Sequence, residues 1–192
     1  MRSRPSGERR KSRIHSAMRE QLSIPAGVLS ELSRRGETLA SAESLTGGLV
    51  GLLLTDVPGA SASYVGGVIS YATRLKSTLA GVDAATLAAL GPVAERTAAE
   101  MARGIAERCN ADWGVATTGV AGPESQDGHP VGEVFVAVSH PSGALLRVKE
   151  LSLKGERAAI REQAAEAALT LLADALGLHS ISAIVDEDAN ET

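Results

Sequence analysis

Hydrophobic and polar positions along this chain predict strands and helices in alternation. Short runs of small or β-branched residues between polar turns indicate buried strands, and apolar residues three and four positions apart indicate amphipathic helices. The predicted strands cover residues 38–42, 64–71, 113–118, 132–139 and 145–153. The predicted helices cover residues 23–32, 49–54, 73–79, 83–90, 94–109 and 154–176. This order is typical of an α/β domain.

The first three predicted strands are expected to be parallel. Right-handed crossovers then place their carboxyl ends at one edge of the sheet. The segments that leave those ends are polar or rich in glycine, namely Glu43–Gly48, Tyr71–Lys76 and Thr118–Gly122. Ligands of open α/β sheets bind outside the carboxyl ends of the strands. We therefore expect a functional site where the three segments meet. The turn at 141–143 predicts a hairpin between the last two strands.

The segment Ser41–Gly48 joins the first strand to a helix and carries several polar groups. Gly47 and Gly48 lack a Cβ, so a ligand can approach the backbone N–H groups at the helix start. Such groups suit an anion or a developing oxyanion. Ser44 and Thr46 add two hydroxyls. The alternative interpretation is an ordinary turn in which one of these hydroxyls caps the helix.

Lys76 is the candidate base in the second segment. It follows Thr73, which we expect to cap a short helix, and both the helix dipole and burial disfavour an ammonium there. The pKa of a lysine would have to fall from about 10.4 to near 7 for it to act as a neutral base at neutral pH. A neutral amine could accept a serine proton, with Tyr71 relaying or orienting it. The alternative is a surface lysine whose ammonium stays in solvent.

Composition excludes several classes of function. Of the 192 residues, 44% are hydrophobic and only 2% are aromatic, which predicts one domain with an Ala, Val and Leu core and no base-stacking surface. A net charge of -4 argues against nucleic-acid or membrane-surface binding. The single cysteine, Cys109, cannot form an internal disulfide and is expected to be a buried residue of a cytoplasmic protein. No apolar run is long enough to cross a bilayer.

Common cofactor and nucleotide motifs are missing from the sequence. His129 and His140 lie in predicted turns without partners at ligand spacing, so no metal and no cofactor is expected. The turn at Thr46–Gly48 lacks the Gly-Lys-Ser/Thr ending of a P-loop. Ser44 is not flanked by the glycines of a nucleophile elbow. Hydroxyl and amine groups are therefore the remaining candidates for chemistry.

The two ends of the chain differ from the predicted domain at 21–178. Residues 1–20 are rich in arginine and serine without apolar periodicity, which predicts a disordered basic tail. Such a tail could contact nucleic acid, although the acidic overall charge argues against it. Residues 179–192 are expected to form an acidic C-terminal tail.

Several segments together are similar to the CinA C-terminal-domain family, whose stand-alone members are PncC-type nicotinamide-mononucleotide deamidases. The similarity runs in order from Leu29 to Leu176. It is carried by Ala42–Gly48, Thr55–Ser61, Gly67–Tyr71 with Lys76, Thr118–Pro123 and Pro130–Gly132. The resemblance implies a three-layer α/β/α fold with a mixed, mainly parallel sheet, and a homodimer or higher homo-oligomer. It also implies a metal-independent serine/lysine amidohydrolase that acts on a nucleotide.

The resemblance also assigns roles to single residues. Lys76 matches the base of the family, Tyr71 its nearby tyrosine, and Arg157 the arginine of a Gly-Asp-Arg segment that reads Gly-Glu-Arg here. Ser44 and Ser61 both match family serines. We prefer Ser44 as the nucleophile, because Ser61 precedes its strand and is expected at the opposite edge of the sheet. Only a partner subunit could then bring Ser61 to Lys76.

These roles predict a reaction. Ser44 would attack the carboxamide, Lys76 would accept and return the proton, and Arg157 would pair with the phosphate. Backbone N–H groups of Thr46–Gly48 or Gly119–Gly122 would hold the oxyanion. The predicted substrate-binding residues are Glu43, Thr46, Gly47, Gly48, Thr118, Gly119, Ala121, Gly122 and Arg157.

The sequence departs from the family pattern at three places. Leu45 stands where many members have cysteine, 73–75 replaces a common Asn-Glu-Ala, and the loop 124–129 is less rich in glycine. These differences bear on substrate preference more than on fold. The larger nucleotide-pyrophosphatase domain often fused to this module is not in the sequence, so we expect the stand-alone form. The alternative function is a catalytically silent nucleotide-binding regulatory module of the same fold.

Overall fold

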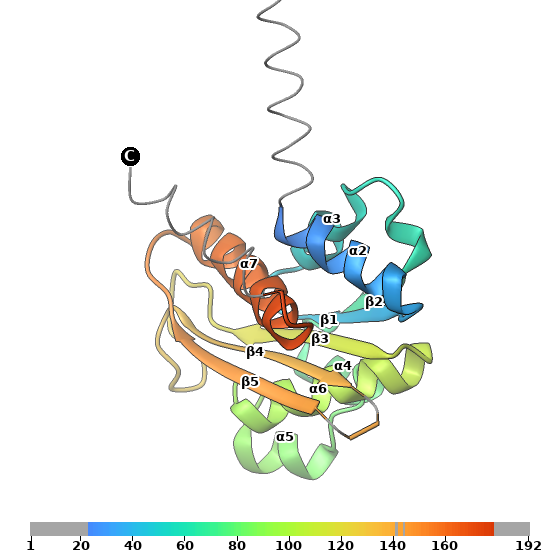
Figure 1. The fold of residues 1–192 in the computed structure, drawn as a ribbon. Helices are drawn as coiled ribbons and strands as arrows, with labels where there is room; N and C mark the ends of the chain where they lie inside the picture. The colour runs from blue at the N-terminus through green and yellow to red at the C-terminus, as the bar shows by residue number, and fades with distance from the viewer. Residues whose placement is uncertain (1–22, 141, 144, 179–192) are drawn as a thin grey trace, which may run out of the picture.

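The computed structural model describes residues 23–140, 142–143 and 145–178. The two predicted tails, 1–20 and 179–192, lie outside these ranges (Figure 1). Within the described part of the chain, no helix has the length and apolar character needed to span a bilayer.

A five-stranded sheet forms the middle layer, in the order β2-β1-β3-β4-β5. Strand β1 is parallel to both of its neighbours, whereas β4 is antiparallel to both of its own. This mixed sheet confirms the three parallel strands and the final hairpin predicted from the sequence. The strand bounds are β1 Leu39–Glu43, β2 Tyr64–Ile69, β3 Trp113–Gly119, β4 Glu133–His140 and β5 Leu145–Ser152.

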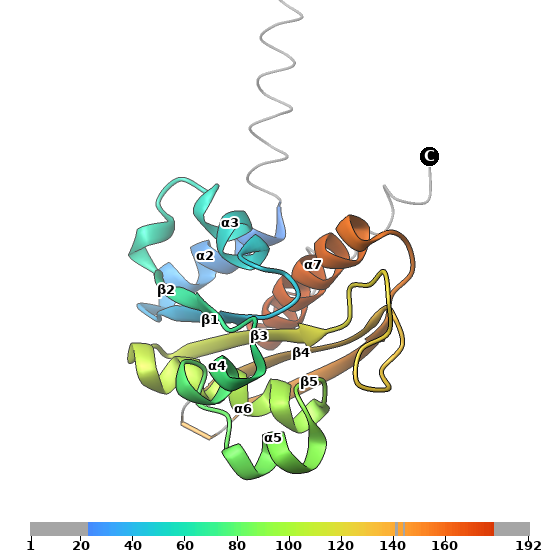
Figure 2. The same cartoon turned by 180° about the vertical axis from the view of Figure 1, so that it is seen from behind.

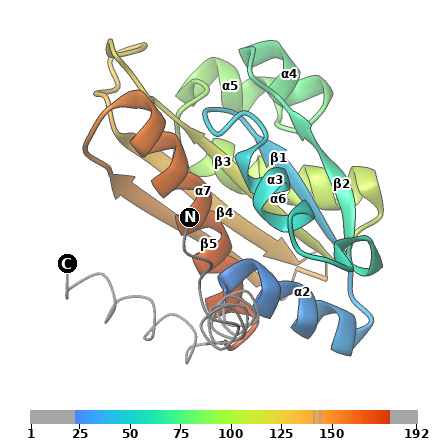
Figure 3. The same ribbon diagram turned by 90° about the horizontal axis from the view of Figure 1, so that it is seen from above.

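Helices cover both faces of the sheet, which confirms the three-layer α/β/α fold (Figures 1 and 2). One face carries α2 (Ile24–Arg35), α3 (Leu49–Thr55) and α7 (Arg157–Ala175), and Figure 3 looks onto it. The other face carries α4 (Thr73–Thr78), α5 (Ala84–Leu90) and α6 (Glu95–Cys109). A short 3-10 helix, η1 (Ala60–Ala62), precedes β2.

Small residues let the layers approach closely. A Cβ on Gly114 of β3 would lie 1.9 Å from the carbonyl oxygen of Ala102 in α6, so only glycine fits there. On the opposite face, Ala164, Ala165 and Ala168 of α7 are fully buried. The core is therefore built from alanine, valine and leucine, as the composition predicts. Trp113 is the one tryptophan of the sequence and is 4% exposed, which makes its fluorescence a reporter of unfolding.

The register aligns the carboxyl ends of the three parallel strands. Glu43, the last residue of β1, pairs with Ile69 of β2 and Thr117 of β3. The pairing extends one residue further, because the Ser44 N–H donates to the Thr117 carbonyl (3.0 Å) and the Ser70 N–H donates to the Glu43 carbonyl (2.8 Å). The three segments that leave these strands therefore start at the same edge of the sheet.

The helix-capping predictions have mixed outcomes. Asp83 caps α5, because its carboxylate accepts the Ala85 N–H at 2.8 Å. The prediction that Thr73 caps α4 is wrong: Ala72 occupies the cap position without a side-chain bond, and Thr73 is the first helical residue. Lys76 is therefore the fourth residue of α4.

Candidate active site

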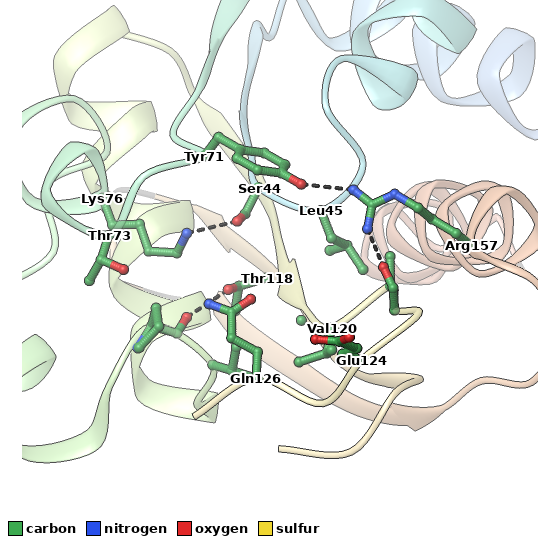
Figure 4. Close-up of a pocket in the computed structure, with 15 residues that line it drawn as sticks. Ser44, Leu45, Tyr71, Thr73, Lys76, Thr118, Val120, Glu124, Gln126 and Arg157 are labelled. Carbon is green, nitrogen blue, oxygen red and sulfur yellow. Dashed lines mark hydrogen bonds between the residues drawn. The ribbon is translucent and has the colours of Figure 1, made fainter. Parts of the chain in front are cut away.

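A pocket lies at this edge of the sheet, where the three exit segments meet the start of α7 (Figure 4). The β1 exit contributes Ser44 and Leu45, and the β2 exit contributes Tyr71, Thr73 and Lys76. The β3 exit supplies the run from Thr118 to Gly122, and α7 supplies Arg157. The predicted convergence of the three segments is thus present in the structure.

Ser44 and Lys76 contact each other inside the pocket. The Lys76 Nζ lies 2.7 Å from the Ser44 Oγ and also donates to the Ser70 carbonyl at 3.0 Å (Figure 4). Both side chains are largely shielded, with Ser44 7% and Lys76 2% exposed. The lysine reaches the serine because β2 ends beside β1 and α4 begins soon after it. The pair has the nucleophile-to-base distance required for covalent catalysis.

Burial lowers the pKa of Lys76 from 10.5 to about 8. Among the described residues, no carboxylate lies within ion-pair distance of its amine. The charged form therefore gains no ion pair to offset the lost hydration. A substantial fraction of neutral amine is then present at mildly alkaline pH, which is the form that can accept the Ser44 proton.

Ser61 lies away from this pair. It is an exposed residue of η1, immediately before β2, whereas Tyr71 and Lys76 follow β2. A six-residue strand spans about 20 Å at roughly 3.3 Å per residue. Within one chain, Ser61 and Lys76 are therefore at opposite edges of the sheet, as expected from the strand order.

Glu43 caps helix α3 instead of facing the pocket. Its buried carboxylate accepts the N–H groups of Gly48 (2.9 Å), Val50 (3.1 Å) and Gly51 (2.9 Å), as well as the Thr46 hydroxyl (2.7 Å). The prediction of a Ser44 or Thr46 cap is wrong, because a glutamate reaches three amides at once. The α3 amides are therefore not available to an oxyanion.

Four predicted substrate-binding residues build the turn and do not line the pocket: Glu43, Thr46, Gly47 and Gly48. Thr46 is fully buried, and its hydroxyl lies between the Glu43 carboxylate and the Thr117 hydroxyl. Gly47 and Gly48 have positive φ angles of 60° and 103°, which glycine adopts without strain. Their contribution to the site is the shape of the turn that presents Ser44.

The β3 exit lines the wall of the pocket that faces Ser44 and Lys76. Thr118 is fully buried and its hydroxyl donates to the Pro92 carbonyl at 2.6 Å (Figure 4). A Cβ on Gly119 would lie 2.5 Å from the Glu133 carbonyl oxygen, so this position requires glycine. Ala121 and Gly122 continue the wall. Thr118 therefore ties this segment to the α5–α6 connection.

Arg157 links two walls of the pocket at its rim. Its guanidinium donates to the Tyr71 hydroxyl at 2.8 Å and to the Gly122 carbonyl (Figure 4). Tyr71 is 58% exposed. Tyr71 is predicted to relay or orient the Lys76 proton, but the partners of Lys76 are Ser44 and Ser70. The structure thus joins Tyr71 to Arg157 and not to the amine.

Several residues at the site are not predicted from the sequence. Glu124 and Gln126, in the loop that departs from the family pattern, line the pocket together with Pro92 and Val93. Arg161 donates to the carbonyls of the turn that holds Ser44. Its position four residues after Arg157 on the same helix was the available signal, because residues spaced by four share a helix face.

The described residues contain no cluster of three or more His, Cys, Asp or Glu side chains arranged around a possible metal position. His129 lies 3.0 Å from Glu133, and His140 lies 2.7 Å from the Ser142 hydroxyl. Neither histidine lines the pocket.

Most of this chain matches a known protein family. The family model described as the CinA C-terminal domain matches residues 21–176. A CinA-like protein of Frankia casuarinae is 49% identical over 150 residues, which cover 78% of this chain and 34% of that protein. A CinA-like protein of an Anaeromyxobacter strain is 41% identical over 183 residues, covering 90% of this chain and 44% of the relative. The chain therefore spans less than half the length of these curated relatives.

Solved structures show the same fold. The competence/damage inducible protein CihA of Agrobacterium tumefaciens superposes with a TM-score of 0.76 at 32% identity, covering 82% of this chain and 96% of that one. The competence damage-inducible protein A of Klebsiella pneumoniae gives a TM-score of 0.77 at 32% identity, covering 82% and 97%.

Proposed function

Because this chain belongs to the CinA C-terminal domain family, we propose that it is a metal-independent amidohydrolase that converts nicotinamide mononucleotide and water to nicotinic acid mononucleotide and ammonia. The observation that carries the proposal is the buried contact of 2.7 Å between the Lys76 amine and the Ser44 hydroxyl. A buried lysine with a lowered pKa beside a serine suits nucleophilic attack better than a structural role, because burial of an amine without a carboxylate partner costs stability.

The reaction proceeds in two halves. Neutral Lys76 takes the Ser44 proton as the Oγ attacks the carboxamide carbon, giving a tetrahedral oxyanion. When this intermediate collapses, Lys76 returns the proton to the leaving nitrogen, and ammonia departs while an ester remains on Ser44. Water then attacks the ester, Lys76 accepts its proton and passes it to the Ser44 Oγ, and the carboxylate product is released.

At the exits of β1 and β3, three backbone N–H groups are candidates for binding the oxyanion. Gly48 is excluded because its N–H donates to Glu43, and Gly47 because its N–H donates to the Ser44 carbonyl. The N–H groups of Leu45, Ala121 and Gly122 belong to pocket-lining residues and have no acceptor within the described part of the chain. Leu45 directly follows the nucleophile, the position that supplies an oxyanion donor in other serine hydrolases.

Arg157 is suited to bind the phosphate. A guanidinium carries five N–H donors, and the contacts with Tyr71 and Gly122 use two of them. Its exposed position at the rim leaves the remaining donors accessible to a dianionic group. The carboxamide would then lie at the Ser44 end of the pocket and the phosphate at the Arg157 end.

The outer edge of β2 supports the further proposal that the protein forms a homodimer or higher homo-oligomer. β2 pairs only with β1 among the described strands, and its Val65 and Ile69 side chains are 50% and 52% exposed. A hydrophobic edge strand without a cover is prone to association. A second copy covering this edge could also bring its own Ser61 nearer to the site.

Ammonia release from nicotinamide mononucleotide tests the proposed activity. We expect turnover by the unmodified protein and by Ser61→Ala, and none by Ser44→Ala or Lys76→Met. Loss of activity in Ser61→Ala with retention in Ser44→Ala would assign the nucleophile to Ser61 of a partner subunit. Nucleotide binding without ammonia release would instead support the silent regulatory module.

A further inference from the structure

Arg161 braces the turn that presents Ser44. Its Nε donates to the Leu45 carbonyl at 3.0 Å and its Nη2 donates to the Thr46 carbonyl at 2.7 Å. The arginine comes from α7, more than a hundred residues further along the chain. At Gly47, a Cβ would lie 3.3 Å from the Arg161 Nη2, which is a tight contact.

These two contacts set the orientation of consecutive peptide planes. A carbonyl and the N–H of the next residue share one plane and point in opposite directions. Arg161 holds the Thr46 carbonyl and therefore orients the Gly47 N–H, which donates to the Ser44 carbonyl at 3.1 Å. The Ser44 carbonyl shares its plane with the Leu45 N–H. The arginine thus acts through two peptide planes on a candidate oxyanion donor.

Both arginines near the start of α7 make contacts outside the helix. Arg157 is the first residue of α7, where a cation opposes the helix dipole, and Arg161 lies one turn further along, where that effect has largely decayed. Among the described ion pairs, none involves either arginine. Their guanidinium groups donate instead to backbone carbonyls at the exits of β1 and β3.

We propose that Arg161 is a positioning residue that keeps the Leu45 N–H oriented for the oxyanion formed at Ser44. The inference rests on the proposed nucleophilic role of Ser44 but not on the identity of the substrate. It predicts that loss of the guanidinium slows the attack and leaves ground-state binding and the Lys76 amine unchanged.

Labelling of Ser44 by a fluorophosphonate, followed by intact mass, tests this inference without the natural substrate. The phosphoryl oxygen of the probe develops charge where the oxyanion would lie. We expect Arg161→Gln to slow labelling by about 10- to 100-fold, less than the roughly 100- to 1000-fold cost of losing an oxyanion donor outright, because the Leu45 N–H is misaligned but still present. With nicotinamide mononucleotide, kcat should fall similarly while KM changes less than about threefold, since KM reports ground-state binding. The pH midpoint of labelling should not move.

Two further variants complete the test. Arg103→Gln removes an exposed arginine of α6 and should label at the unmodified rate. Arg161→Lys keeps the charge but cannot span both carbonyls, so it should be slowed as well. Trp113 fluorescence shows whether Arg161→Gln is folded. If it is not, labelling of Arg161→Lys tests the inference: slowed labelling supports it and unchanged labelling overturns it.

The remaining outcomes separate this inference from the proposed function. Labelling of unmodified Ser44 without ammonia release refutes the nucleotide substrate, and the Arg161 comparison still decides the inference. Absence of Ser44 labelling in the unmodified protein overturns both. If Arg161→Gln is folded and labels at the rate of the unmodified protein, the inference is overturned. A rise in KM together with a shifted pH midpoint of labelling also overturns it, because the substitution would then have disturbed the whole site.

Discussion

Glu43 and Ser44 are adjacent at the end of β1, yet their side chains contact opposite layers of the fold. The Glu43 carboxylate accepts amides at the start of α3, whereas the Ser44 hydroxyl contacts Lys76 of α4. This separation follows from the alternation of side chains along extended backbone. One residue therefore builds the turn and the other is free for chemistry.

Glu43→Gln should destabilise the protein. The amide nitrogen of glutamine cannot accept an N–H bond, so at least one buried donor at the start of α3 loses its partner. We expect a loss of about 1–3 kcal/mol in the free energy of unfolding. Urea unfolding followed by Trp113 fluorescence measures it, with the exposed Glu107→Gln as the control. Equal stability of the two variants would contradict the capping role.

Lys76→Met should abolish amidase activity and raise stability at pH 7. The cause is the buried ammonium. The pKa of Lys76 is about 8 in the folded protein and 10.5 in the unfolded chain, so at pH 7 the protonated amine favours the unfolded chain. The free energy of unfolding should rise by on the order of 1–3 kcal/mol. Loss of the hydrogen bond to the Ser70 carbonyl reduces this gain. The unfolded chain binds more protons between these two pKa values, so the unmodified protein gains stability as pH rises from about 8 to 10.5.

The stability advantage of Lys76→Met should therefore shrink across that pH window. Urea unfolding at pH 7 and pH 10 measures the difference. An advantage that stays constant with pH would show that burial does not lower the pKa of this amine.

The pH dependence of kcat/KM should report the same group. Only neutral Lys76 accepts the serine proton, so the rate should rise tenfold per pH unit below about 8 and level off above it. Tyr71→Phe should keep this midpoint, because the Tyr71 hydroxyl contacts Arg157 and not the amine. A flat profile between pH 6 and 9 would exclude Lys76 as the base.

Arg157→Gln should raise KM for nicotinamide mononucleotide by about 10- to 100-fold, the usual effect of losing a charge-assisted hydrogen bond. Tyr71→Phe should have a smaller effect in the same direction, since its hydroxyl positions the guanidinium. Nicotinamide riboside, which lacks the phosphate, serves as the matched substrate. An equal loss with both substrates would mean that Arg157 does not bind the phosphate.

Much of the fold and the location of the site follow from the sequence. The spacing of apolar residues is a local property, and it predicts β1, β2 and β3 to within a few residues. Parallel order then requires their carboxyl ends to share an edge, which brings Ser44 and Lys76 to one place and leaves Ser61 at the other. The resemblance to a known family adds the expectation that these two residues form the serine/lysine pair of an amidohydrolase.

Tertiary structure alone decides how the polar groups pair. Whether Glu43, Ser44 or Thr46 caps α3 depends on which side chain reaches the helix start, and Tyr71 has a neighbour in Arg157 that lies 86 residues away. Burial of Lys76, and so its pKa, results from segments packed around it. Periodicity carries no information on such contacts, because it describes which face of an element is buried and not what lies against it.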